Sequence, residues 1–158
     1  MYWRKLLKEV EMIKVRKAEI NDAESISHLC SELGYPSGSD TISNRLELIK
    51  RDPGHCVFVA IHDKTIVGWI HAMIVLHLES DSFVEIGGMV VSHSFRDRGI
   101  GKMLVEEIRE WASVNNTGSI RVGCQTKRLD AHQFYETIGF TSLKVQTIFE
   151  LTPEDSLS

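Results

Sequence analysis

The stretch over residues 83–114 constrains the fold of this chain more than any other. An apolar, strand-like run over 83–91 is followed by a polar loop and by a helix over 100–114 with apolar residues at helical spacing. Gly99 and Gly101 stand where that helix begins. The first backbone N–H groups of a helix lack internal partners, and glycine leaves room for a phosphate to reach them. The stretch therefore predicts a strand–loop–helix unit that can bind an anion.

Positive side chains surround this glycine pair. Arg96, Arg98 and Lys102 all lie in the loop or the first helical turn. Two common nucleotide motifs are excluded, because Lys102 is not followed by Ser or Thr as in a Walker motif and the G-x-G-x-x-G spacing of a Rossmann fold is absent. On this fragment alone, a turn that simply needs glycines explains the pattern as well as an anion site does.

The rest of the chain predicts one α/β domain. Residues 65–78 alternate between a wholly apolar face and a mixed face that carries His71 and His77, and Asp63-Lys64 indicates a tight hairpin before them. The remaining predicted elements are strands over 12–18, 56–62, 119–125 and 140–151, two helices between residues 21 and 52, and a helix over 130–137. A length of 158 residues suits a single domain.

Composition narrows the setting of the chain. The net charge of -4, without a long run of one sign, gives no indication of nucleic-acid binding. Three widely spaced cysteines predict neither a disulfide framework nor a zinc site, so we expect a reducing, cytoplasmic location. The longest apolar stretch, 65–78, is too short to span a bilayer, and residues 1–10 lack the features of a signal peptide.

A second motif identifies the family that the chain resembles. Residues 131–140 fit A-x-x-F-Y-x-x-x-G-F without a gap, with Ala131, Phe134, Tyr135, Gly139 and Phe140 at the fixed positions, and residues 96–101 fit R-x-x-G-x-G. Both motifs, at this separation and in this order of elements, are those of the GNAT acetyltransferases, so the chain resembles that family over residues 12–151. Residues 1–11 are then an N-terminal extension and residues 152–158 a polar tail. The resemblance implies an α/β (α+β) GNAT fold, in which a mixed, mostly antiparallel central sheet with one parallel, splayed strand pair is flanked by helices on both faces.

The resemblance also implies acetyl-CoA as co-substrate, bound where the parallel strands over 83–91 and 119–125 splay apart. Backbone groups of Val90 and Val91 would pair with the pantetheine arm and polarise the thioester carbonyl. The pyrophosphate would lie over the glycine loop, from Arg96 to Lys102. The expected acetyl-CoA contacts are Val90, Val91, Arg96, Asp97, Arg98, Gly99, Ile100, Gly101, Lys102, Arg128, His132 and Phe134. Many family members carry Asn at the position of Arg128. The pattern Arg-x-x-Ala-His-x-Phe-Tyr over residues 128–135 is more similar to the branch that includes aminoalkylphosphonate and some aminoglycoside acetyltransferases. No metal is needed, because the thioester is already activated.

Two side chains are expected to move protons. An amine like that of lysine has a pKa of about 10.4, so only about one molecule in 10^3 is neutral at pH 7 and a general base assists. Glu85, just upstream of the cofactor segment, is the expected base, unless it is a carboxylate paired with a cation; His71, His77 or a water is the alternative base. Tyr135 is expected to protonate the leaving thiolate, because a phenol keeps its proton at pH 7.

Together these features predict an N-acetyltransferase that moves acetyl from the CoA thioester to the primary amine of a small molecule by direct attack. The acceptors considered are aminophosphonates, polyamines, aminoglycosides and amino acids. Two alternatives stay open: an acetyltransferase for protein N-termini or lysines, and a non-catalytic, acetyl-CoA-binding regulatory module. We expect no nucleic-acid or membrane partner, and a homodimer is compatible with the sequence.

Overall fold

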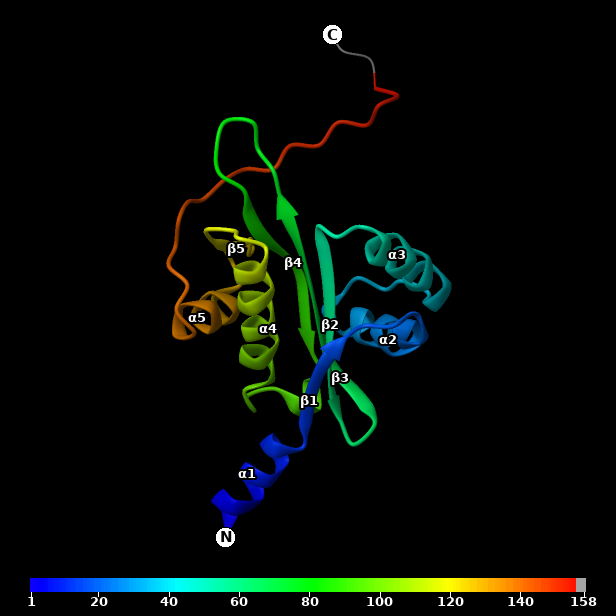
Figure 1. The fold of residues 1–158 in the computed structure, drawn as a ribbon, viewed down its shortest axis with the longest axis vertical. Coiled ribbons are helices and arrows are strands. Elements are labelled where there is room, and N and C mark those ends of the chain that lie inside the picture. The colour runs from blue at the N-terminus through cyan, green and yellow to red at the C-terminus, as the bar shows by residue number, and fades with distance from the viewer. Residues whose placement is uncertain (156–158) are drawn as a thin grey trace. The chain divides into compact units, whose positions relative to one another are not determined.

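The structure, a computed structural model, describes residues 1–155 without the side chains of residues 6, 7 and 9–11 (Figure 1). The helices are α1 (Tyr2–Glu11), α2 (Ala23–Leu33), α3 (Ser39–Arg51), α4 (Ile100–Val114) and α5 (Leu129–Thr137), with short 3-10 turns η1 (Ile20–Asp22) and η2 (His93–Phe95). The strands are β1 (Ile13–Lys17), β2 (His55–His62), β3 (Thr65–Val75), β4 (Phe83–Val91) and β5 (Ile120–Val122). The chain divides into two compact units, Met1–Gly123 and the residues from Cys124 onward.

The strands form one sheet in the order β1-β2-β3-β4-β5. Each neighbouring pair is antiparallel except β4 and β5, which are parallel. This confirms the predicted mostly antiparallel sheet with one parallel pair. Asp63 and Lys64, between β2 and β3, have φ angles of 44° and 68°, the left-handed conformation of a tight two-residue hairpin, which confirms the predicted turn.

A β-bulge interrupts the pairing of β3 with β4. The register shifts between His71 and Ala72, which makes Gly87 the extra residue of β4. A Cβ atom on Gly87 would lie 2.7 Å from Cε of Met73 and 3.2 Å from Nδ1 of His71. Glycine at this position therefore lets both side chains of β3 lie against the backbone of β4.

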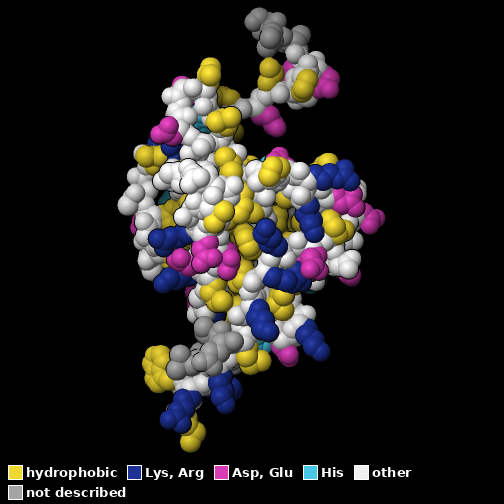
Figure 2. Space-filling view, viewed as in Figure 1, with side chains coloured by type: hydrophobic (Ala, Val, Ile, Leu, Met, Phe, Trp, Pro, Cys, Tyr) yellow, Lys and Arg dark blue, Asp and Glu magenta, His cyan; other side chains and the backbone are white. Residues whose placement is uncertain are grey.

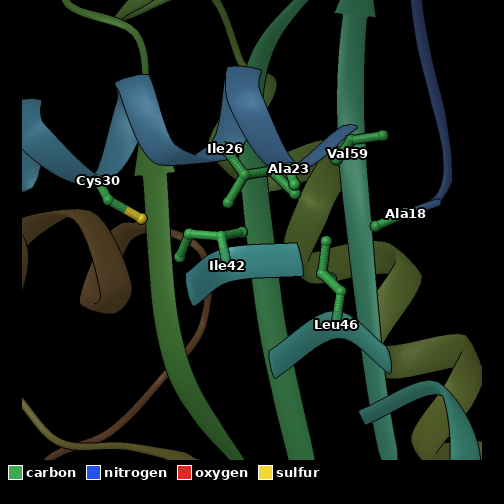
Figure 3. Close-up of a cluster of buried hydrophobic side chains, with 7 residues drawn as sticks. All are labelled: Ala18, Ala23, Ile26, Cys30, Ile42, Leu46 and Val59. Carbon is green, nitrogen blue, oxygen red and sulfur yellow. The ribbon is translucent and has the colours of Figure 1, made fainter. Parts of the chain in front are cut away.

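Helices α2 and α3 cover one face of the sheet (Figure 1). Their apolar side chains meet those of the sheet in a buried cluster, in which residues from α2, α3 and β2 point toward one another (Figure 3). The cluster consists of Ala18, Ala23, Ile26, Cys30, Ile42, Leu46 and Val59, and Trp69 of β3 packs against it. Because alternate residues of a strand share a face, His71 and Met73 lie on the same face as Trp69.

Helix α4 covers the opposite face. Its residues Ile100, Leu104 and Ile108 are 1% exposed or less, as their helical spacing predicts. A Cβ on Gly68, the residue before Trp69, would lie 3.4 Å from Leu104 and 3.6 Å from Ile100. The sheet is thus flanked by helices on both faces, as expected, and β4 runs between the two layers.

Three predicted strands are shorter in the structure. β1 spans Ile13–Lys17 instead of 12–18. β3 ends at Val75 instead of Leu78, because Val75 makes the last pair with β4 at Phe83. Leu76 and Leu78 then lie outside the sheet, with exposures of 83% and 103%. β5 spans Ile120–Val122 instead of 119–125, because its pairing with β4 covers only these residues.

The predicted strand over 140–151 is wrong: within residues 1–155, no strand follows α5. Apart from the half-buried Phe140, the large apolar side chains of this segment are 60% to 90% exposed, and they are Leu143, Val145, Ile148, Phe149 and Leu151. A strand requires neighbouring backbone groups to pair with its own N–H and C=O groups. The apolar pattern of the segment predicts a strand but does not supply that partner.

The surface carries both signs of charge. On the face in Figure 2, Lys and Arg side chains are interspersed with Asp and Glu side chains. This agrees with a net charge of -4 that arises from 18 basic and 22 acidic residues without long runs. Within residues 1–155, no helix combines the length and the apolar character needed to cross a membrane.

Candidate active site

The free edge of β4 is the first feature of the site. β4 pairs with β5 only from Val84 to Ile86, yet it continues to Val91. On the β5 side, residues 87–91 have no strand partner within the described residues 1–155. An extended ligand with amide groups can add to such an edge as a further strand. Val90, which is buried, and Val91, which is half-buried, both lie on this segment.

The N-terminus of α4 follows this edge in the chain. Gly99 is its N-cap and has a φ of 80°, a left-handed conformation that favours glycine. Ile100 is buried, Gly101 is half-buried, and the first N–H groups of the helix have no partner within it. These groups and the helix dipole favour an anion. The other predicted contacts of this loop are exposed, and they are Arg96, Asp97, Arg98 and Lys102.

Long-range contacts hold the loop between β4 and α4. The backbone N–H of His93 donates to Oε2 of Glu32 on α2 at 3.0 Å, and the rings of Phe95 and His62 lie 5.0 Å apart. Nε of Arg96 donates to the last carbonyl oxygen of β4 at 3.4 Å. The contact of Glu32 with the loop could not be predicted from a local sequence pattern, because it joins residues 61 positions apart.

Glu85 lies on β4, two residues before the bulge. It is half-buried on the sheet face that α2 and α3 cover, opposite Met73 of β3 and Arg121 of β5. Gly87 is exposed, so the backbone beside Glu85 is open to solvent. A carboxylate here can accept a proton from a ligand bound at the adjoining free edge of β4.

A pair of histidines lies on the same face. Nδ1 of His55 and Nε2 of His71 are 3.0 Å apart, and the two rings stack. Burial lowers the pKa of His71 to about 4, and the charge of His55 adds to this shift, so His71 is neutral at pH 7. Nε2 of His55 lies 3.7 Å from Oδ2 of Asp52. The register of β2 and β3 creates this pair, and neither His55 nor Asp52 was singled out from sequence.

His77 lies outside β3 and is exposed. The edge of its ring faces Phe83 at 5.4 Å between centroids, and its Nδ1 lies 3.7 Å from Oε1 of Glu79. The strand therefore ends before it reaches His77, and only His71 of the two predicted histidines belongs to the sheet.

Arg121, on β5, is a candidate site residue that was not singled out from the sequence. Its Cζ lies 4.0 Å from the centroid of the Phe83 ring, two residues before Glu85 on the neighbouring strand. This places the guanidinium on the same sheet face as Glu85. Only the pairing of β4 with β5 brings the two residues together, so no local pattern marks Arg121.

The second unit carries Tyr135. Its ring packs edge-on against Phe134 and Phe140, with centroids 5.0 Å and 5.3 Å away. Burial raises the pKa of Tyr135 to about 12; nearby Cys124 raises it further, and Arg128 acts in the opposite direction. The phenol is therefore fully protonated at pH 7, as a proton donor must be.

The other predicted residues of this unit lie around α5. Arg128 is exposed at the start of the helix, and Phe134 is half-buried. Nε2 of His132 lies 2.9 Å from the carbonyl oxygen of Gln125, so this nitrogen carries the proton and donates it. Burial raises the pKa of the Cys124 thiol, which makes it a poor nucleophile. Among the described residues, no three His, Cys, Asp or Glu side chains are grouped as a metal site requires.

Known proteins resemble this chain in parts of its sequence. The human N-acetylaspartate synthetase is 37% identical over 90 residues, which are 57% of this chain and 29% of that protein. The chain thus spans about a third of the length of the N-acetylaspartate synthetases it matches. An uncharacterized N-acetyltransferase of Bacillus subtilis, YhdJ, is 26% identical over 114 residues, covering 72% of this chain and 80% of that protein.

The fold is that of an aminoglycoside acetyltransferase of known structure. AAC(6')-Iy, solved with a bisubstrate analogue of CoA and acetylneamine, superposes with a TM-score of 0.79 over 89% of this chain and 98% of that one, at 19% identity. Residues 20–140 match the Acetyltransferase (GNAT) family. This range contains the free edge of β4, the glycine loop before α4 and the aromatic motif of α5. The chain is therefore a member of the GNAT family of acetyltransferases.

Proposed function

We propose that this enzyme transfers acetyl from acetyl-CoA to the primary amine of a small molecule by direct attack. The observation that carries the proposal is the free edge of β4 at residues 87–91, which follows Glu85 on the same strand and leads into the glycine-capped N-terminus of α4. Such an edge suits the amide-bearing pantetheine arm, and the helix start suits the pyrophosphate. Arg96, Arg98 and Lys102 supply the positive charge that a polyphosphate requires.

The residues have distinct roles in the proposed reaction. Glu85 removes one proton from the substrate ammonium, and the neutral amine then attacks the thioester carbonyl carbon. The new C–N bond forms, the C–S bond breaks, and the amide nitrogen loses a second proton. The thiolate of CoA gains a proton from Tyr135, which is restored by the proton lost from nitrogen, so that CoA leaves as the thiol.

The relatives support a small acceptor. The N-acetylaspartate synthetases are named for an acetylated amino acid, and streptothricin acetyltransferase of Escherichia coli, 30% identical over 90 residues, is named for streptothricin. A reducing cytoplasm is the proposed setting, and the three free cysteines Cys30, Cys56 and Cys124 support it. A homodimer remains a proposal that sedimentation would test.

The decisive experiment is turnover of acetyl-CoA, measured as free thiol, against a panel of acceptors. The panel holds aspartate, a polyamine, an aminoglycoside, an aminophosphonate and a lysine-containing peptide. We expect acetylation of at least one small amine at a higher kcat/KM than that of the peptide. A preference for the peptide would favour a protein acetyltransferase, and binding of acetyl-CoA without any turnover would favour a regulatory module.

Replacing Glu85 by Gln tests the base. We expect Glu85→Gln to lower kcat about 10²-fold at pH 7 and less at pH 10, where more of the amine is already neutral. Glu110→Gln is the matched control, because Glu110 is an exposed residue of α4. If the acidic limb of the pH–rate profile survives in Glu85→Gln, a histidine or a water is the base.

A further inference from the structure

The guanidinium of Arg121 has no anionic partner among the described residues of the first unit, Met1–Gly123. No described carboxylate of this unit lies within ion-pair distance of it, and no described acceptor within hydrogen-bond distance. The guanidinium instead contacts the face of the Phe83 ring, at 4.0 Å. A guanidinium that stacks by its face keeps its N–H groups, which lie along its edge, free to bind a carboxylate in two hydrogen bonds.

The position of Arg121 relative to Glu85 makes this guanidinium relevant to the acceptor. The two residues are register partners on the neighbouring parallel strands β4 and β5. Neighbouring strands lie about 4.8 Å apart, and side chains at paired positions share a face. The two residues are therefore neighbours on one sheet face, and the guanidinium of Arg121 lies over Phe83, two residues before Glu85 on β4. A small amino acid bound on this face can direct its amine to Glu85 and its carboxylate to Arg121. Arg121 is half-buried, which strengthens its attraction for an anion.

The residues of β3 closest to Glu85 on this sheet face add no charge. His71 is neutral at pH 7, and Met73, the residue paired with Glu85 on β3, is uncharged. His55, on β2 beyond His71, lies 3.7 Å from the carboxylate of Asp52. Glu85 itself forms no ion pair with Arg121, so each group is available to a ligand. An acceptor that bears only an amine would leave the charge of Arg121 unused, whereas an amino acid would satisfy both groups.

From this arrangement we infer that the acceptor carries a carboxylate next to its amine, and that Arg121, supported by Phe83, binds this carboxylate. The inference rests on the proposed acetyl transfer to a small amine and narrows its substrate class to amino acids. Arg121 sets which acceptors bind and takes no part in moving protons. Glu85 then faces the ammonium group, and the acetyl group is transferred to the nitrogen as described above.

The test compares aspartate with its diamide, which keeps the amine and has no carboxylate. Each acceptor is measured in the parent and in Arg121→Gln, so differences in amine basicity cancel. In Arg121→Gln the carboxylate of aspartate loses its hydrogen bonds to a charged group. We therefore expect kcat/KM for aspartate to decrease about 10- to 100-fold. We expect little change for the diamide. The kcat/KM of Arg121→Lys for aspartate should lie between the values of the parent and of Arg121→Gln, because lysine keeps the charge and lacks the planar guanidinium.

Two controls separate this inference from the proposed function. Arg109→Gln removes the same charge from an exposed position of α4, and thermal unfolding checks that each variant is folded. Calorimetric titration of aspartate into the protein with CoA present measures binding without chemistry. If no amine is acetylated but aspartate binds only when Arg121 is present, the carboxylate site stands and the transfer function fails. The carboxylate site would be overturned if Arg121→Gln lowered kcat/KM equally for aspartate and for the diamide. It would also be overturned if the variant kept the kcat/KM of the parent for aspartate and bound aspartate as tightly as the parent does.

Discussion

Tyr135 combines a polar group with an apolar environment. Phe134 and Phe140 pack against its ring, and burial raises its pKa to about 12. The same burial that keeps the proton on the phenol at pH 7 also excludes the phenolate from the folded state. Because the folded pKa exceeds the value of about 10 for an unfolded chain, the contribution of Tyr135 to stability is lost as the pH rises from 10 toward 12.

Tyr135→Phe keeps the ring and removes only the proton that the phenol can give. We expect kcat to fall about 10²-fold, the low end for loss of a general acid, because a thiolate needs less assistance than an alkoxide. Affinity for acetyl-CoA and thermal stability at pH 7 should stay nearly unchanged. Tyr35→Phe, at a residue that is 66% exposed, is the matched control. Full activity of Tyr135→Phe in single turnovers limited by chemistry would show that Tyr135 only packs.

The residues that sequence reasoning found differ in kind from those it missed. Gly99 and Tyr135 belong to motifs whose chemistry depends on neighbours in the chain, such as the start of a helix or a run of aromatic residues. His55 meets His71, and Arg121 meets Glu85, only through the register of paired strands. Register depends on the whole sheet, so a reading of one segment at a time cannot supply it.

At the scale of elements, the unit from β4 to α4 was predicted with the bounds that the structure has, 83–91 and 100–114. Its apolar spacing, its glycines and its length all indicate the same elements. The segment over 140–151 has only an alternating pattern in its favour, and the structure contains no strand there. A helix pairs its backbone N–H and C=O groups within itself, whereas a strand pairs them with residues distant in the sequence. The local pattern therefore predicted the strand ends, and the strand over 140–151, less well than the helix.

The helix start can be tested as a phosphate site. A double variant, Arg96→Ala with Gly101→Val, removes a charge and places a branched side chain on the first turn of α4. We expect affinity for acetyl-CoA to fall by at least about 10²-fold, since charge-assisted hydrogen bonds and backbone access are both lost. Calorimetry measures the affinity.

The matched control for this variant is Arg109→Ala with Gly118→Ala. Arg109 is exposed, and a Cβ on Gly118 would meet no atom within 4 Å. The control should bind acetyl-CoA as the parent does. Unchanged affinity in a folded Arg96→Ala, Gly101→Val protein would contradict the pyrophosphate assignment.

At the scale of the whole molecule, burial is divided unevenly along the chain. The largest fully buried side chains, such as Ile70, Leu104 and Ile108, all lie in the first unit. The apolar side chains after α5 are largely exposed, with Phe149 at 90%. Stability should therefore depend mainly on the sheet and the helices that cover it.

A pair of substitutions measures this division. Leu104→Ala should lower the free energy of unfolding by about 2–5 kcal/mol, because it leaves a cavity between α4 and the sheet. Phe149→Ser should change it by no more than about 0.5 kcal/mol, as for other exposed positions. Chemical denaturation gives both values. A cost above 1 kcal/mol for Phe149→Ser would mean that this side chain is covered in solution.

The free edge of β4 has a consequence for how enzymes of this kind diverge. Under the proposed function, the co-substrate is held by backbone groups of residues 87–91, which every residue type except proline provides. The acceptor is held by side chains, among them Glu85 and Arg121 on one face of the same strands. Mutations at the acceptor positions can therefore accumulate without loss of acetyl-CoA binding. A lineage can acquire a new substrate by single steps, each of which leaves a working donor site.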